Sequence, residues 1–322
     1  MRAELAKGGR ANAPPDAKGD RRVPKSVSEG HTSRRQGGRR ARRLGRRRGL
    51  RRPTWPTHLM LVVVVAVLVG PVLYAMLVST QSNNDLFSFQ LWPGDRLDDN
   101  WDVVWNERNL GQFMLTSTVV SVIIAFGKVV TSLLAGLAFV YFRFPGKWVV
   151  FGFVLVTLLM PTEISILALF RQVSDLGWQE NGPWGLPPLG LTVPFFASAT
   201  GAFLFRQHFA NLPADLSEAA QIDGVTPLQF LFKILIPLSW NAIGALLVIQ
   251  FIYGWNMYLW PLLLQPDDQL IQVGLGGLRN ADQGQAYGPL MLGALLASIP
   301  PILVFLALQK PFMKGMAIGR NK

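Results

Sequence analysis

The sequence contains no cysteine and only three histidines in 322 residues. The absence of cysteine excludes disulfide bonds, thiolate metal ligands and a cysteine nucleophile. The histidines, His31, His58 and His208, are scattered along the chain and predict no metal cluster. Charge is also scarce, because 16% of the residues are charged where soluble domains average about 25%. With 50% apolar residues and a mean hydropathy of +0.29, the chain is not an ordinary soluble protein.

The basic residues are concentrated near the N-terminus. Residues 1–58 hold 18 of the 31 lysines and arginines and four acidic residues, so their net charge is +14, whereas the remainder carries −2. Residues 1–54 have almost no large apolar side chains to offset the entropy of ordering, so we predict a disordered cytoplasmic tail. The run Arg34 to Arg52 also suits electrostatic contact with anionic lipid or nucleic acid. We expect membrane lipid as a partner and no nucleic acid.

Six stretches are apolar and long enough to cross a bilayer, which takes about 20 residues per helix. The first, LMLVVVVAVLVGPVLYAMLVS, has no polar stripe at helical spacing, which argues against a soluble core helix. An even number of spans places both termini on one side of the membrane. The sequence therefore predicts an all-α membrane protein with six transmembrane helices and both termini in the cytoplasm. The predicted spans are residues 59–79, 113–142, 148–170, 191–209, 237–264 and 286–308.

The loops between the predicted spans favour the same orientation. Cytoplasmic loops of membrane proteins carry an excess of lysine and arginine. Even without the tail, eight basic residues fall on the predicted inner side and four on the outer side. The inner residues are Arg143, Lys147, Arg206, Lys233, Lys310, Lys314, Arg320 and Lys322, and the outer residues are Arg96, Arg108, Arg171 and Arg279.

The predicted cytoplasmic segment at residues 211–238 has clear helix start and stop signals. Pro213 suits the first turn of a short helix. Gly224 supplies the positive φ that commonly ends a helix. Thr226 and Pro227 are typical of an N-cap and a first helical residue, so a second helix is expected to enter the fifth span. These residues predict a short helix, a sharp turn and a helix that leads into the membrane.

The same segment contains Glu-Ala-Ala, then three residues, a glycine, nine residues, and Ile-x-x-Pro at residues 234–237. This pattern resembles the EAA loop of permease subunits of type I ATP-binding-cassette importers, with Ile236 where the family usually has leucine. The resemblance implies that the short helix docks on an ATPase subunit, with Glu218 as its charged anchor and Gly224 as its turn. The coupling residues implied in this way are Glu218, Ala219, Ala220, Asp223 and Gly224.

The resemblance covers residues 55–322 and implies a six-helix permease fold. The chain has no Walker motif, so it is not expected to be an enzyme: a partner ATPase dimer would bind ATP and magnesium, and this chain would hold neither cofactor nor metal. A second permease subunit and an extracytoplasmic solute-binding protein are the other implied partners.

The expected divisions of the chain are the tail at 1–54, the first span and external loop at 55–112, the permease core at 113–309 with its EAA loop at 211–237, and a cytoplasmic end at 310–322.

Several segments point to a narrower group. The chain end from Gln309 to Phe312 looks like that of sugar-importer permeases related to the maltose system. Residues 142–147, 191–209 and 251–263 resemble permease subunits of sn-glycerol-3-phosphate importers. The resemblance implies a cargo of glycerol-3-phosphate or a glycerophosphodiester, and the alternative is a neutral oligosaccharide or polyol.

Two ionisable residues lie inside predicted spans, where a charge costs roughly 2.5–3.5 kcal/mol on insertion scales. Lys128 is near the middle of the second span and Glu163 follows Pro161 in the third. One interpretation is a structural bridge between Lys128 and Glu163 that joins the two spans. The other places one or both on the translocation path, where Lys128 attracts a phosphate.

Polar and aromatic residues crowd the predicted outer half of the fifth span. Tyr253, Trp255, Asn256 and Tyr258 suit stacking and hydrogen bonding to a polyol or sugar-like cargo. They suit an aromatic belt at the outer interface equally well. We therefore treat these four residues, with Lys128 and Glu163, as the candidate translocation path.

Prolines are expected to interrupt several of these spans, because a proline lacks the N–H that a helix interior needs. Pro161 and Pro261 fall within predicted spans three and five. The pair Pro300 and Pro301 predicts a bend in the sixth span.

Overall fold

The computed structural model of the protein describes residues 55–160, 162–180, 186–265, 270–279 and 286–317, without the side chains of 161–163 and 311–317. Across these ranges the chain forms helices and connecting turns and contains no strand, so the predicted all-α class is confirmed. The predicted tail at 1–54 and the last five residues of the predicted cytoplasmic end lie outside the described residues.

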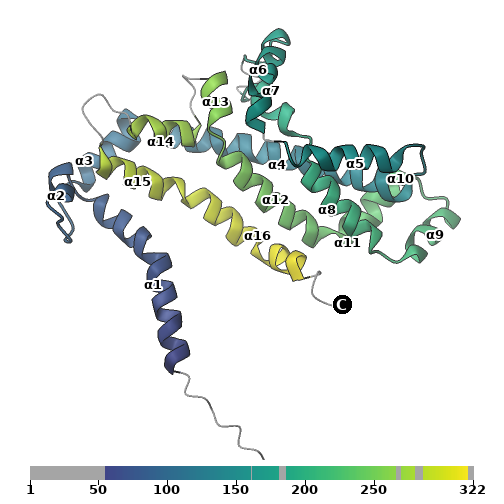
Figure 1. Ribbon diagram of the computed structural model, residues 1–322, viewed down its shortest axis with the longest axis horizontal. Coiled ribbons are helices and arrows are strands. Elements are labelled where there is room, and N and C mark those ends of the chain that lie inside the picture. The colour runs from purple at the N-terminus through teal and green to yellow at the C-terminus, as the bar shows by residue number, and fades with distance from the viewer. Residues whose placement is uncertain (1–54, 161, 181–185, 266–269, 280–285, 318–322) are drawn as a thin grey trace, which may run out of the picture. The chain divides into compact units, whose positions relative to one another are not determined.

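The helices follow one another from Trp55 almost to the C-terminus (Figure 1). The first ten are α1 (Trp55–Val78), α2 (Asn83–Phe87), α3 (Leu97–Trp101), η1 (Asp102–Glu107), α4 (Leu110–Tyr141), α5 (Lys147–Thr157), η2 (Thr162–Ser165), α6 (Ile166–Asp175), α7 (Leu189–Thr192) and η4 (Val193–Phe195). The remainder are α8 (Ala199–Ala210), α9 (Ala214–Ile222), α10 (Pro227–Phe230), η5 (Leu231–Leu235), α11 (Ile236–Leu238), α12 (Trp240–Trp255), α13 (Leu259–Leu264), α14 (Ile271–Arg279), α15 (Tyr287–Ala297) and α16 (Ile299–Ala317).

All six predicted spans coincide with helical segments. Four stretches of the described chain are long and apolar enough to cross a membrane unaided, namely Trp55–Val78, Leu110–Tyr141, Leu189–Ala210 and Tyr287–Lys310. Pro227–Leu238 and Trp240–Trp255, two helices that meet at 82°, are long and apolar enough to make a fifth crossing if they are counted together as one bent span. The predicted third span is the exception, because its first helix, α5, has only 11 residues.

Breaks divide four of the predicted spans, the third to the sixth. Prolines lie close to the breaks in the third, fifth and sixth. In the third span α5 ends at Thr157, four residues before Pro161, because a proline has no N–H to bond the carbonyl four residues earlier and its ring clashes with that carbonyl. In the fifth span α12 ends at Trp255, and α13 resumes with Pro261 in its first turn. In the sixth span the predicted interruption lies at Ser298, between α15 and α16 and two residues before Pro300.

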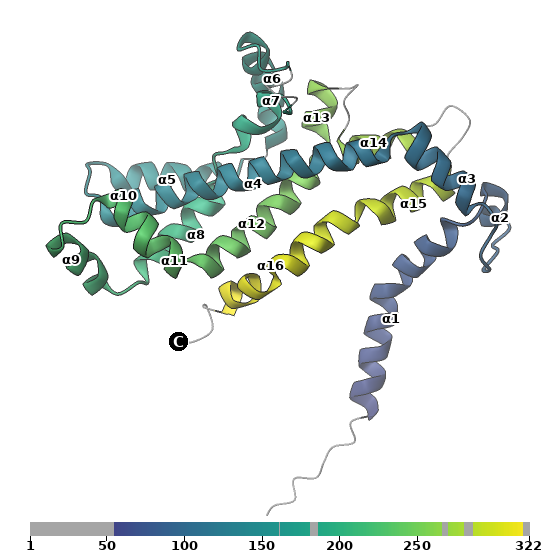
Figure 2. The same cartoon turned by 180° about the vertical axis from the view of Figure 1, so that it is seen from behind.

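The helix α4 is the scaffold on which the site is built. It packs against α8 and α12, while α12 also packs against α16 (Figures 1 and 2). Three clusters of buried apolar side chains fill these contacts. One joins α4, α8 and α12 to the 211–238 segment, the second joins α4 and α12 to α14 and α15, and the third joins α4 to α6, η4 and α13.

In contrast, α1 has almost no protein neighbours. Only 6% of its most apolar 18-residue window is buried, and among the described residues it packs mainly against α15. A helix with a mean hydropathy of 2.8 over that window is stable when lipid or another apolar chain covers it. Most of the α1 surface therefore faces lipid or a partner chain.

Small residues let α4, α8 and α12 approach one another closely. Such residues are common between membrane helices, because packing rather than hydrophobicity drives helix association there. A Cβ added at Gly254 of α12 would lie 2.9 Å from the Cα of Ser121 on α4. A Cβ at Gly136 of α4 would lie 2.7 Å from the Cβ of Phe205 on α8. The sharpest approach is at Gly201 of α8, where an added Cβ would overlap the side chain of Ser132.

Gly201→Val is therefore expected to destabilise the chain by about 1–3 kcal/mol, the usual cost of overpacking a well-filled core. The measurement is thermal unfolding of the purified protein in detergent, together with its abundance in the membrane. Gly152→Val on α5 is the control, because no atom lies within 4 Å of a Cβ built there. Combining Gly201→Ala with Ser132→Gly is expected to recover most of the loss caused by Gly201→Ala alone. Equal stability of the Gly201→Val and Gly152→Val variants would contradict this packing.

Candidate functional site

The segment between α8 and α12 forms the predicted short helix and sharp turn. α9 starts after Pro213 and ends at Ile222, with Gly224 at φ 67°. The Gly224 N–H donates to the Gln221 carbonyl at 3.1 Å and the Val225 N–H to the Ala220 carbonyl at 2.9 Å. These two bonds and the positive φ make a Schellman motif, which satisfies the last carbonyls of the helix. The predicted helix end at Gly224 is confirmed.

The second helix starts as predicted at Thr226. The Gln229 N–H donates to the Thr226 hydroxyl oxygen at 3.4 Å, and the Thr226 N–H donates to the Gln229 side-chain oxygen at 3.1 Å. This reciprocal capping box satisfies two N–H groups that have no partner inside the helix. Pro227 follows as the first helical residue, where its missing N–H has no cost. The turn between α9 and α10 is therefore fixed at both ends.

Charged and apolar side chains share the exposed side of α9. Glu218, Ala219 and Asp223 are exposed, and Ile222, at 86% exposure, presents a large apolar side chain to the surroundings. Ala220 differs from its neighbour, since it is buried at 6% exposure against the chain's own core. Only Ala219 of the pair therefore faces outward. The residues of the exposed face of α9 are Asp215, Glu218, Ala219, Ile222 and Asp223.

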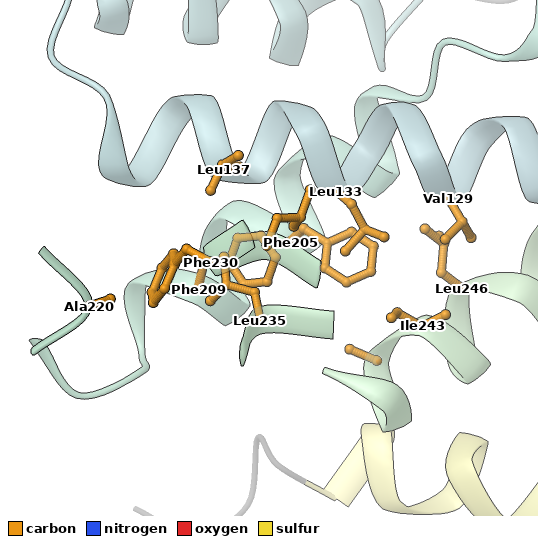
Figure 3. Close-up of a cluster of buried hydrophobic side chains, with 12 residues drawn as sticks. Val129, Leu133, Leu137, Phe205, Phe209, Ala220, Phe230, Leu235, Ile243 and Leu246 are labelled. Atoms are coloured by element: carbon orange, nitrogen blue, oxygen red, sulfur yellow. The ribbon is translucent and has the colours of Figure 1, made fainter. Parts of the chain in front are cut away.

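The buried side of the loop is continuous with the core of the bundle. Figure 3 shows Ala220 beside Phe209 and Phe230, and beyond them Leu235 and Leu133. These five side chains come from five different helices of the fold. α9 therefore shares one packed cluster of side chains with α4 and α8.

Lys128 is buried in the middle of α4, with 7% of its surface exposed. Its ammonium nitrogen lies 3.6 Å from the centre of the Tyr253 ring on α12. A cation over an aromatic face is stabilised by the ring quadrupole, and the effect grows when water is excluded. The structure therefore brings together two residues of the candidate translocation path from two different spans.

Uncharged polar groups lie on the same helices. The buried Gln250, one turn before Tyr253 on α12, has its amide nitrogen 3.5 Å from the hydroxyl oxygen of Ser198, the N-cap of α8. The hydroxyl of Thr131 donates to the carbonyls of Lys128 and Phe196, at 3.1 and 2.6 Å. Gln250 and Ser198 were not among the predicted site residues. A search for buried amides as well as charges within spans would have found Gln250.

The remaining path residues are spread over different surroundings. Trp255 is buried and stacks on Phe251 at 5.8 Å within the second core cluster. Asn256 is exposed and accepts a hydrogen bond from the side chain of Gln272 at 3.3 Å. Tyr258 is 43% exposed. Glu163 belongs to η2, but its side chain lies outside the described residues, so a bridge to Lys128 stays a prediction.

Among the described side chains, no group of three or more His, Cys, Asp or Glu residues is placed to hold a metal ion. The features that stand out are instead a bundle of apolar helices, a buried lysine between two of them, and an exposed helix and turn between α8 and α12. A bundle of this kind, apolar along most of its length and broken by a buried charge, is the architecture of an integral membrane protein.

Comparison with known proteins gives the family. Residues 117–317 match the family described as the inner membrane component of binding-protein-dependent transport systems, and the chain belongs to this family. It is 40% identical over 271 residues to an sn-glycerol-3-phosphate transport system permease protein UgpE of Agrobacterium fabrum, covering 80% of this chain and 94% of the relative. The UgpE protein of Salmonella choleraesuis is 37% identical over 281 residues, covering 84% and 97%.

Solved structures show the same fold. A bacterial ABC transporter that imports the acidic polysaccharide alginate matches with a TM-score of 0.60 at 22% identity, over 80% of this chain and 95% of the other. The alginate transporter in complex with a periplasmic protein bound to alginate pentasaccharide matches with a TM-score of 0.52 at 16% identity, over 79% and 93%. The chain is a multi-pass permease subunit of an importer, with the type I permease fold predicted from its sequence, and not an enzyme.

Proposed function

We propose that this chain forms half of the translocation path of an ATP-driven importer for glycerol-3-phosphate or a glycerophosphodiester. The observation that carries the proposal is the similarity to sn-glycerol-3-phosphate permeases over 80% of the chain. The buried Lys128 adds a chemical reason, because a positive charge excluded from water attracts a phosphate far more strongly than one in solution. We therefore place the phosphate of the cargo near Lys128 and Tyr253 during transport.

The exposed face of α9 is proposed as the contact with an ATPase subunit, with Glu218 as its charged anchor. Its support is the EAA pattern together with the rigid Schellman turn at Gly224 and the exposure of Glu218. In this scheme the partner ATPase dimer binds ATP and magnesium and moves α9 as it closes. That motion passes through the core cluster of Figure 3 to α4 and α8, which lead to Lys128.

The remaining partners and the orientation belong to the same proposal. A second permease subunit supplies the other half of the path, and an extracytoplasmic binding protein delivers the cargo. Both termini and α9 lie in the cytoplasm. This orientation is supported by the eight basic residues on the inner side against four on the outer side.

The decisive measurement is cargo uptake by the complete importer in liposomes. We expect uptake of glycerol-3-phosphate to exceed that of maltose by about tenfold or more, because a site built around a buried charge disfavours a neutral cargo that leaves it unpaired. Glycerophosphocholine, which keeps the phosphate, distinguishes a diester preference from a monoester preference. The binding protein is assayed separately for each compound, so that its selectivity is not attributed to the permease. Faster uptake of maltose than of either phosphate compound would replace this proposal with the neutral-sugar alternative.

A further inference from the structure

The chain leaving α1 forms a loop that returns to the helix end and is held there by one buried side chain. Gln81 is 1% exposed, and its amide nitrogen donates to the carbonyls of Gln90 and Trp92, both at 2.8 Å. The Gly94 N–H donates to the Thr80 hydroxyl oxygen at 3.0 Å. Residues 82–94 are therefore a closed loop with a fixed base at the end of α1.

The first half of this loop, which contains α2, is also held by specific contacts. Ser82 and Asp85 form a capping box at the start of α2, and the hydrogen bond from the Ser82 N–H holds the pKa of Asp85 below its ordinary value of 3.8. The cap is therefore complete at neutral pH and is lost only as the pH falls through that lowered value. The Phe87 ring packs edge-on against Tyr287, with 5.9 Å between ring centres, and ties α2 to the start of α15.

This rigid loop displays large apolar side chains. Phe89 is 88% exposed, Trp92 is 78% exposed and Leu91 is 72% exposed. Phe89 also adopts a φ of 56°, a conformation that is strained for a side chain of its size. Residues 86–94 contain no charged residue. A strained, fixed loop with a neutral apolar tip marks an interaction surface, because folding alone does not favour it.

We propose that residues 88–92 are an interfacial anchor that inserts into the lipid leaflet adjoining the C-terminal end of α1. The loop follows directly after α1, an apolar helix of which only 6% of the most apolar window is buried. In both views the connection after α2 extends toward the side from which α1 arrives (Figures 1 and 2). Tryptophan beside aliphatic and aromatic residues, without charge, is typical of chains that lie at the membrane interface.

The anchor gives α1 a fixed depth in the membrane. Among the described residues α1 packs mainly against α15, and the Asn100 side chain donates to the carbonyls of Ser79 and Gln81 just beyond its last turn. Contacts to the rest of the described chain therefore gather at the C-terminal end of α1, beside the loop. The hydrogen bonds of Gln81 couple the tip to the last turn of α1, and any movement of α1 along its axis would move the tip out of the leaflet. The inference needs neither a particular cargo nor a particular orientation, so its failure would leave the proposed function untouched.

The absence of cysteine makes this proposal simple to test. Phe89→Cys and Leu91→Cys are each labelled with an environment-sensitive fluorophore in the full chain, assembled with cysteine-free partner subunits in phosphatidylcholine nanodiscs. Asp98→Cys on α3 is the matched control, since it lies nearby, is exposed and replaces a charged residue. With doxyl-labelled lipid and no binding protein present, we expect the labels at 89 and 91 to be quenched about twofold or more relative to the label at 98, because only they lie at the lipid interface.

A second variant tests the anchoring by Gln81. In the Leu91→Cys background, Gln81→Met removes both hydrogen bonds to the loop and is expected to reduce the quenching toward the level of the Asp98→Cys control. Equal quenching at 89, 91 and 98 would overturn the proposal. So would labels at 89 and 91 that become shielded only when the binding protein is added, since that result would assign the tip to protein docking.

Discussion

Gly224→Val is expected to lower cargo-dependent ATP hydrolysis and transport by about tenfold or more while leaving the chain in the membrane. The glycine has a φ of 67°, and a β-branched residue is strongly disfavoured there. Because no atom lies within 4 Å of a Cβ built at this position, the cause is backbone conformation and not a clash. A forced change of φ breaks the Schellman bonds and reorients α9 relative to α10. The measurements are ATPase activity of the assembled importer and uptake in liposomes, and we expect both to fall by about tenfold or more, as a strain of 1–3 kcal/mol implies.

Gly224→Asn provides the matched control. Asparagine tolerates positive φ far better than valine, so this variant is expected to retain most of the activity. Glu218→Ala tests the charge of α9 apart from the geometry of its turn, because it removes the proposed anchor and leaves Gly224 in place. We expect Glu218→Ala to weaken ATPase binding while α9 stays folded. Wild-type transport by the double variant Glu218→Ala with Gly224→Val would refute the coupling role of α9.

The segment at residues 211–238 was the part of the candidate site that the sequence predicted best, because its helix start and stop signals are local. A glycine at a helix end and a Thr-Pro pair at a helix start act through neighbouring backbone groups, and both positions are confirmed. The local sequence did not predict that Ala219 is exposed while Ala220 is buried. Adjacent helical residues point about 100° apart, and which of them faces the core depends on Phe209 and Phe230 from other parts of the chain.

For the candidate path residues, too, the surroundings of each side chain could not be predicted from the local sequence. Sequence placed Tyr253, Trp255, Asn256 and Tyr258 on one short stretch, but α12 and the break at Asn256 direct them differently. Tyr253 meets Lys128, whereas Trp255 packs beside Phe251. The contact between Lys128 and Tyr253 joins residues 125 positions apart and has no local signal. The sequence predicted that helices break near prolines. It did not predict the residues at which α5 and α12 end, because these depend on packing.

Lys128→Met is expected to lower the uptake of glycerol-3-phosphate by about 10- to 100-fold, the effect of losing a hydrogen bond to a charged group. Methionine fills a similar volume and stays apolar, so abundance and basal ATPase activity should remain close to wild type. Ser132→Ala is the matched control, because Ser132 is buried one turn further along the same helix and carries no charge. Tyr253→Phe keeps the ring beneath the ammonium and should transport nearly normally, whereas Tyr253→Leu removes it.

The structural alternative for Lys128 makes the opposite prediction. If Lys128 is bridged to Glu163, either single neutralisation leaves one buried charge without its partner, and abundance should fall. The double variant Lys128→Met with Glu163→Gln removes both charges and would then restore abundance. Measuring abundance and uptake together separates the two roles, because a purely structural lysine is rescued in both respects. Restored abundance with uptake of glycerol-3-phosphate still lost would assign Lys128 to the cargo, whereas recovery of both would exclude that assignment.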